Sequence, residues 1–139
     1  MTGIRYITKE DKEYWYSLDK HLPQDEYDKK VRDGQGYIIS ADEKSVGILR
    51  YNMFWDNTPF FTMIYIGEAF RNKGYGKALM QYWHDDMKKK GYGIVLTSTQ
   101  VNEDAQHFYR ALGYKDCGSL IMDIEGYEQP MEMFMIKKI

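Results

Sequence analysis

The spacing of hydrophobic positions changes along the chain from a helical period to a strand period. After a short strand at 4–7, apolar side chains recur three or four positions apart, which predicts a helix over 8–21 and a second one closed by Gly34. Three runs rich in Ile, Val, Phe and Tyr come next, separated by the turns ADEK and DNT; they cover 36–40, 45–55 and 59–67. Three strands joined by short turns predict an antiparallel meander.

In the second half of the chain, helical patterns alternate with strand patterns. A long helix is predicted from about 74 to 90, followed by a nearly continuous apolar run at 92–99 that is typical of a strand buried on both faces. A further helix is predicted over 102–113, and two strands end the chain at 116–124 and 131–139. This order predicts an α/β fold: a mixed, mostly antiparallel sheet of six to seven strands with helices on both faces.

Composition narrows the class of protein. The chain has 139 residues without a linker-like stretch, which predicts a single domain over 1–139. Its net charge of −2 gives no basic field for nucleic acid. Cys117 is the one cysteine, which fits a reducing compartment. No run approaches the ~18 apolar residues of a membrane helix, and no signal peptide is evident. We therefore expect a cytoplasmic protein with no nucleic-acid or membrane partner.

The stretch RNKGYG at 71–76 is the first candidate for chemistry. It lies between a predicted strand and a predicted helix, and a helix start offers unpaired N–H groups that attract anions. Gly74 and Gly76 let these groups approach a bulky phosphate, while Arg71 and Lys73 add positive charge. A helix entry that merely tolerates glycine is the alternative, although each helical glycine costs up to about 1 kcal/mol relative to alanine.

Two common phosphate loops do not fit this stretch. A Walker loop requires Ser or Thr after its lysine, and Ala78 follows Lys77. A Rossmann loop requires a third glycine where Leu79 stands, and the preceding meander is no βαβ unit.

A second motif, NEDAQHFYRALGY at 102–114, follows the glycine stretch by about 25 residues. The pair, R-x-x-G-x-G after a strand and N-x-x-A-x-x-F-Y-x-x-L-G-Y later, resembles the GCN5-related N-acetyltransferase (GNAT) family across essentially the whole chain. The predicted order of strands and helices is also that of the family.

The resemblance implies a cosubstrate, acetyl-CoA, and no metal. In the family it lies where two central parallel strands splay apart, here 59–67 and 92–99. Its pantetheine arm pairs with the first strand as an added β-strand would, and its diphosphate rests on the following helix start. The implied binding residues are Ile64, Tyr65, Ile66, Arg71, Asn72, Lys73, Gly74, Tyr75, Gly76, Lys77, Asn102 and Tyr109.

The resemblance also implies direct transfer of the acetyl group to an amine. Tyr109 corresponds to the tyrosine beside the thioester sulfur, and the backbone N–H of Ile66 is the candidate donor to the oxyanion. We expect Phe108 to fill the core and Tyr109 to face the cleft, although a core position for Tyr109 is the alternative. Asn102 is also well placed to cap the following helix.

The base that deprotonates the amine is left open. No acid lies in 59–67, and Thr97 stands where the ribosomal-alanine branch of the family has a glutamate. Glu68, Asp56, Glu103 and a water relay stay as alternatives.

The acceptor is an amine-bearing small molecule or peptide of unknown identity. The first two helices and the hairpin tip FWDNTPF would form its wall, with Tyr14, Trp15, Tyr27, Trp55 and Asp56 suited to an organic cation. His21, His84 and His107 show no metal-ligand spacing and are expected at the surface. Apolar side chains on both faces of the last strand suggest a homodimer.

Two other functions compete with acetyl transfer. One is a catalytically silent module that senses acetyl-CoA, since no obvious base is present. The other is a nucleotide-binding protein that uses the same glycine turn.

Overall fold

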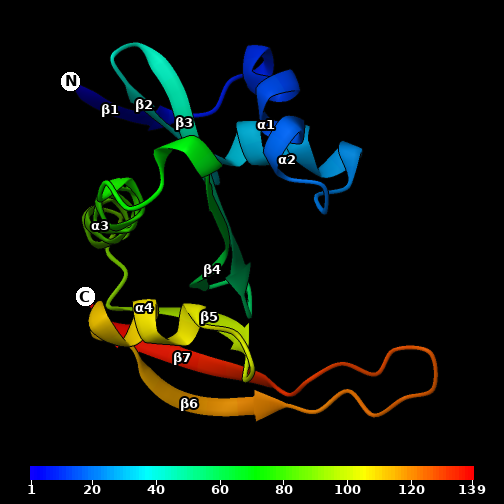
Figure 1. The fold of residues 1–139 in the computed structure, drawn as a ribbon. Coiled ribbons are helices and arrows are strands. Elements are labelled where there is room, and N and C mark those ends of the chain that lie inside the picture. Colours follow the sequence, from blue (N-terminus) through cyan, green and yellow to red (C-terminus); the bar gives the residue numbers. More distant parts are fainter. The chain divides into compact units, whose positions relative to one another are not determined.

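The computed structural model describes residues 1–139, and its elements follow the predicted order (Figure 1). The strands are β1 (Thr2–Tyr6), β2 (Gly36–Ala41), β3 (Lys44–Phe54), β4 (Thr58–Ile66), β5 (Ile94–Gln100), β6 (Lys115–Leu120) and β7 (Glu132–Lys138). The helices are α1 (Lys12–Leu18), α2 (Gln24–Asp33), α3 (Tyr75–Lys89) and α4 (Ala105–Ala111), with single 3₁₀ turns η1 (Lys9–Asp11) and η2 (Glu68–Phe70). A seven-stranded sheet has the order β1-β2-β3-β4-β5-β7-β6. Because β4 and β5 pair in parallel while β1 with β2, β2 with β3, β5 with β7 and β6 with β7 pair antiparallel, the predicted mixed sheet is confirmed.

The chain divides into two compact units, and each is described by itself. The first contains Met1–Asn52 and Thr62–Asp86, and the second contains Met53–Phe61 and Met87–Ile139. The single domain expected from the sequence stays a prediction.

Helices cover both faces of the strands in the first unit (Figure 1). Apolar side chains on both faces of β2 produce this arrangement, because neighbouring side chains of a strand point to opposite faces. Ile38 joins a buried cluster with Trp15 of α1 and Tyr27 of α2. Tyr37 points the other way and packs edge-on against Tyr82 of α3, with ring centroids 5.9 Å apart. Burial of both faces therefore fixes the register of this half of the sheet.

Local signals set several helix ends. The Thr8 and Asp11 side chains form a capping box before α1, and Gly34 ends α2 as predicted, with a φ of 65°. Gly91, with a φ of 94°, follows α3 in the same way. The first helix, however, ends at Leu18 and not near residue 21.

The early end of α1 results from the buried carboxylate of Asp19. It accepts hydrogen bonds from the Trp15 indole at 3.1 Å and from Arg50 Nε at 2.8 Å. The backbone N–H groups of His21 and Leu22 donate to its other oxygen at 3.0 and 3.2 Å. Asp19 thus holds the chain in the turn between α1 and α2.

We expect Asp19→Asn to lower the free energy of unfolding by about 2 kcal/mol at pH 7, the scale of a hydrogen bond to a charged group. Burial acts to raise the pKa of Asp19, but the His21 N–H and the charge of Arg50 outweigh it and hold that pKa below its ordinary value. A lowered pKa stabilises the fold above the unfolded value of about 4 and loses that contribution as the pH falls further. Urea unfolding at pH 3 to 7 should therefore show the two proteins converging at low pH. A constant difference would contradict this account.

In the second unit, β7 lies between β5 and β6, and α4 covers one face (Figure 1). Met133 and Met135 are buried on β7, whereas Phe134 and Ile136 alternate with them and are half-buried. Since β7 has strands on both sides, its backbone has no open edge for a second copy. The homodimer stays a prediction, and one formed through β7 would have to use its side chains.

One prediction for α3 is wrong. His84 was expected at the surface but is only 3% exposed, whereas the larger Tyr82 is 40% exposed. The buried side of α3 consists of Leu79, Met80, Trp83, His84 and Met87. The side of a surface helix that faces the core is wide enough to include positions next to the apolar ones, so a polar residue such as His84 can be buried there.

Candidate functional site

The predicted glycine stretch forms a tight turn between η2 and α3 in the first unit. Asn72 has a φ of 63° and Gly74 a φ of 85°, so the chain passes twice through the left-handed region. Asparagine and glycine are the residues that adopt it most readily. A side chain added at Gly74 would meet no atom within 4 Å, so the space above the turn is open.

The start of α3 offers N–H groups next to this open space. The N–H of Ala78 donates to the carbonyl of Gly74 at 3.0 Å, and the three preceding N–H groups, of Tyr75, Gly76 and Lys77, have no carbonyl four residues back within the helix. Lys73 and Lys77 are exposed beside them. Donors and cations therefore lie together where the sequence predicts an anion site.

Arg71 connects this turn to the end of β4. Its Nε donates to the carbonyl of Ile66 at 3.0 Å, and its guanidinium lies 5.0 Å from the centre of the Tyr65 ring. The side chain is exposed, and these contacts leave its Nη groups for an anion. Arg71 thus fixes the strand end and keeps positive charge beside the turn.

The direction of the Ile66 N–H follows from its neighbour. Gly67 donates its N–H to Val46 of β3 at 2.8 Å, and successive N–H groups of an extended chain point to opposite edges. The N–H of Ile66, and by the same alternation the backbone groups of Ile64, therefore point away from β3. Those of Tyr65 point toward β3, so Tyr65 is not available for pairing with an added strand.

Tyr109 is the buried residue of α4 in the second unit. It is 7% exposed, and its ring packs edge-on against Phe61 at 5.6 Å and lies 5.9 Å from Tyr114. Phe108 is only half-buried, so the expectation that Phe108 fills the core in place of Tyr109 is wrong. The short helix turns so that the larger amphipathic ring covers β5.

Burial, followed by the negative charge of Glu103, raises the pKa of Tyr109 far above its ordinary value. A hydrogen bond with the side chain of Thr97 acts in the opposite direction but is the weaker influence. Tyr109 therefore stays protonated at all physiological pH values and can act as a hydrogen-bond donor.

Asn102 lies in an exposed turn after β5. The helix begins only at Ala105, with Asp104 at the capping position, so the predicted capping role of Asn102 is wrong. The amide of Asn102 is accordingly not used by the helix. Beside it, Glu103 accepts a hydrogen bond from the N–H of Gln100 at 3.0 Å.

Two of the five residues predicted to form the acceptor wall are not available to it. Trp15 and Tyr27 are fully buried in the core of the first unit and cannot contact a ligand. Trp55 is 78% exposed but lines a hollow of about 380 Å³ with Leu96 and Ile136. Leu96 precedes Thr97, which pairs with Phe61, the residue on which the Tyr109 ring packs, and neighbouring strand residues face opposite sides. Trp55 thus lies on the face of the second unit opposite Tyr109.

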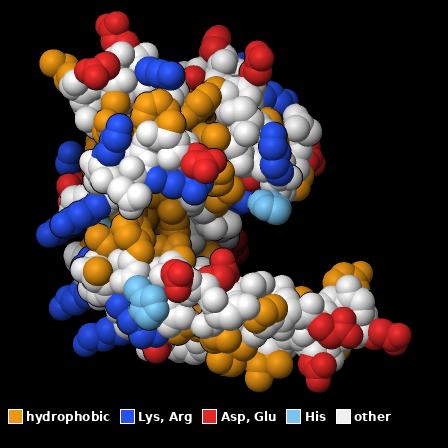
Figure 2. Space-filling view, in the orientation of Figure 1, with side chains coloured by type: hydrophobic (Ala, Val, Ile, Leu, Met, Phe, Trp, Pro, Cys, Tyr) orange, Lys and Arg blue, Asp and Glu red, His pale blue; other side chains and the backbone are white.

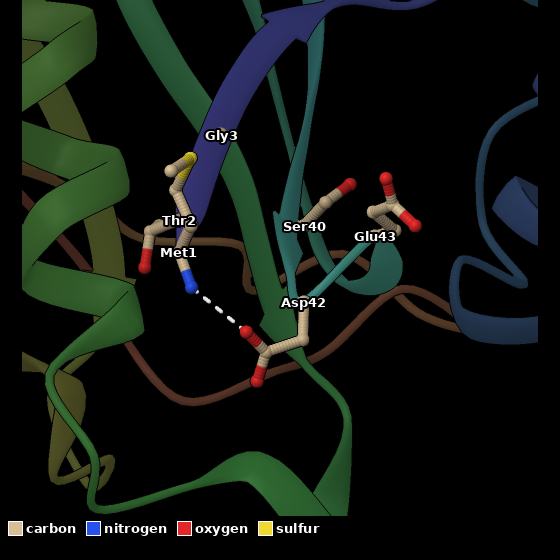
Figure 3. Close-up of a pocket in the computed structure, with 6 residues that line it drawn as sticks. All are labelled: Met1, Thr2, Gly3, Ser40, Asp42 and Glu43. Carbon is tan, nitrogen blue, oxygen red and sulfur yellow. Dashed lines mark hydrogen bonds and ion pairs between the residues drawn. The ribbon is translucent and has the colours of Figure 1, made fainter.

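A second hollow, of about 540 Å³, lies at the edge of the first unit (Figure 3). The N-terminal amine of Met1 pairs there with Asp42 at 2.8 Å, and both groups are exposed. None of the predicted binding residues lines it, so it does not belong to the candidate site.

No group of three or more His, Cys, Asp or Glu residues is placed to hold a metal. No helix is long and apolar enough to cross a membrane.

Acidic residues on the connection between β6 and β7 escaped the sequence analysis. Figure 2 shows acidic and hydrophobic side chains on this projecting segment. Asp123, Glu125 and Glu128 lie on it, and no Lys or Arg occurs between Asp116 and Ile136. A count of charge by segment, in place of the small net charge, would have revealed it.

Comparison with known proteins identifies the family. The sequence profile of the Acetyltransferase (GNAT) family matches residues 4–114, so the chain belongs to this family. Streptothricin acetyltransferase of Streptomyces lavendulae is 34% identical over 65 residues, which are 46% of this chain and 34% of that protein. The chain thus matches about a third of the length of this curated relative.

Solved structures support the same fold. Ard1 from Thermoplasma volcanium has a TM-score of 0.85 at 16% identity, covering 99% of this chain and 97% of that one. Arabidopsis thaliana Naa50, in complex with the bisubstrate analogue CoA-Ac-MVNAL, has a TM-score of 0.81 at 15% identity, with 99% of each chain covered. At these identities the likeness shows the shared fold.

Proposed function

We propose that the protein is an N-acetyltransferase that moves an acetyl group from acetyl-CoA directly to an amine of a small molecule or peptide. The observation that carries the proposal is the left-handed turn at Gly74, with open space above it and the N–H groups of the first turn of α3 beside it. Membership of the acetyltransferase family supports the same reading.

The residues present fit a bound coenzyme A. Its diphosphate would lie on the N–H groups of Tyr75, Gly76 and Lys77, near the Nη groups of Arg71 and the ammonium of Lys73. The backbone groups of Ile64 and Ile66 point away from β3, as pairing with the pantetheine arm requires. The amide of Asn102, which the helix does not use, is assigned to the same arm.

The thioester supplies an activated acetyl group, and the chain supplies hydrogen-bond donors. The N–H of Ile66 is assigned to the acyl oxygen, where negative charge develops during transfer. The hydroxyl of Tyr109 is assigned to the sulfur. Because burial keeps Tyr109 protonated, it can donate to the sulfur without first having to bind a proton.

The base remains a choice among exposed groups. Glu68, Asp56 and Glu103 are all exposed, and a water relay is the fourth alternative. Of the three acids, Glu103 is the one whose charge acts on Tyr109.

The acidic connection between β6 and β7 favours a cationic acceptor. Its carboxylates raise the local concentration of protonated amines by electrostatic attraction. The acceptor's identity, the cytoplasmic location and the homodimer remain predictions.

An assay with a panel of amines tests the proposed function. Release of the coenzyme A thiol would be followed with peptide N-termini, lysine-containing peptides, polyamines and aminoglycosides at physiological pH. We expect turnover with at least one class and a rate that falls as salt increases, because screening weakens long-range attraction. Tight acetyl-CoA binding without turnover on any amine would favour the silent sensor, which the absence of an acid from β4 motivates.

A further inference from the structure

The sheet of the second unit has an apolar hollow on the face opposite α4. This hollow, of about 380 Å³, is lined by Phe54, Trp55, Phe134 and Ile136 among others. The ring of Phe54 lies 4.6 Å from that of Trp55 and 6.4 Å from that of Phe134, so the aromatic side chains form one continuous patch. Trp55 is nevertheless 78% exposed. An exposed apolar patch with a concave centre is typical of a surface that binds another molecule.

Two lysines lie at the rim of this hollow. Residues directly opposite each other in an antiparallel strand pair share a face of the sheet. Lys115 of β6 is opposite Ile136, and Lys138 of β7 is opposite Ile94. Both isoleucines line the hollow, and both lysines are exposed. A segment that fits the hollow therefore has apolar side chains together with carboxylates.

The connection between β6 and β7, residues 121–131, has this chemistry. Figure 1 shows that it projects beyond the ends of the two strands, and none of its residues lines the hollow of its own copy. Its apolar side chains are 71%, 66% and 70% exposed, in chain order Ile121, Ile124 and Tyr127. Between and beside them are the acidic residues Asp123, Glu125 and Glu128. The chain thus exposes both an apolar hollow with a basic rim and an apolar segment with acidic side chains.

We propose that two copies of the chain associate by placing the β6–β7 connection of each copy in the hollow of the other. A two-fold axis repeats the same contact twice, so a second copy covers both exposed surfaces at once. Ile124 and Tyr127 pack against Trp55 of the other copy, and the carboxylates lie near its Lys115 and Lys138. A foreign partner that fitted the hollow would leave the apolar side chains of the connection exposed.

This association leaves the connection acidic. Three carboxylates on residues 121–131 face two lysines at the rim, so one negative charge remains after pairing. The inference concerns assembly and does not depend on acetyl transfer.

Charge reversal on either surface tests the contact. One variant reverses the connection with Asp123→Lys and Glu125→Lys, and the other reverses the rim with Lys115→Glu and Lys138→Glu. All four side chains are exposed, so both proteins should fold as wild type does. In a homodimer each variant brings like charges together at both contacts. We expect each to weaken association at least about tenfold.

The decisive measurement mixes the two variants. The basic connection of one then meets the acidic rim of the other, and the acidic connection meets the basic rim. Both contacts are complementary in the mixed pair, although each variant repels itself. Sedimentation velocity should therefore show a monomer for each variant alone and a dimer for the mixture.

Two further proteins complete the experiment. Lys88→Glu with Lys89→Glu makes the same change of net charge as the rim variant, on exposed residues of α3, and should dimerise as wild type does. Ile124→Ser with Tyr127→Ser removes apolar area from the connection and should produce a monomer, because burial of that area drives the association. Circular dichroism checks that each protein is folded.

Three results would overturn the inference. The first is wild-type protein that stays monomeric across the micromolar range. The second is a dimer that neither charge reversal weakens, which would place the interface elsewhere. The third is a mixture of the two charge variants that remains monomeric. Acetyl transfer is measured separately with the panel of amines, so failure of this inference leaves the proposed function standing.

Discussion

Replacing Tyr109 by phenylalanine should lower kcat about 100-fold, the scale of general acid catalysis, while acetyl-CoA affinity changes little. The substitution keeps the ring that packs on Phe61 and removes only the hydroxyl. The cofactor contacts assigned to the glycine turn are not touched. Because the pKa of Tyr109 is raised, its protonated form persists to higher pH than that of a free tyrosine. The alkaline limb of the rate profile should therefore not reflect loss of this proton below pH 10.

Tyr114→Phe is the matched control for this experiment. Tyr114 is 3% exposed and lies in the same aromatic cluster, but no catalytic role is assigned to it. We expect it to keep kcat near that of wild type. Stopped assays for kcat, calorimetry for acetyl-CoA and thermal unfolding would be measured on both proteins. If Tyr109→Phe unfolds the protein while the folded fraction reacts normally, Tyr109 is a core residue and its catalytic assignment is wrong.

Gly76→Asp should weaken acetyl-CoA binding by about 3 kcal/mol or more, because like charges brought together in a binding site cost several kcal/mol. Gly76 is the second residue of α3, beside the N–H groups assigned to the diphosphate. An acidic side chain in the first turn of a helix interacts favourably with its dipole. The variant should therefore fold at least as stably as wild type, so that lost binding is due to the ligand site.

Gly76→Asn and Gly76→Ala separate charge from volume. Asparagine has the size of aspartate without its charge, and alanine adds only a methyl group. We expect both to bind acetyl-CoA more tightly than Gly76→Asp does. Calorimetry with CoA, ATP and NAD⁺ on wild type tests the ligand class, since ATP or NAD⁺ binding ahead of CoA would favour the nucleotide-binding alternative. Unchanged CoA affinity in a folded Gly76→Asp protein would falsify the diphosphate site.

The sequence by itself determined the order of the elements, several of their ends and the turn before α3. These features depend on short-range physics. The Thr8 capping box and the Gly34 and Gly74 turns involve residues at most a few positions apart, so the chain carries the whole signal locally. The two motifs gave the family for the same reason, because each is a contiguous pattern.

The tertiary structure decided which side of each element is covered. Trp15 and Tyr27 are residue types that often contact organic cations, yet here they are buried because α1 and α2 pack on β2 and β3. Trp55 lies on the face opposite Tyr109, and Tyr109 itself is buried by strands that come from distant parts of the chain. Asp19 ends α1 early because Arg50, thirty-one positions away, reaches it. A side chain's burial and hydrogen-bond partners depend on neighbours that only the folded chain brings together, so no local pattern could have specified them.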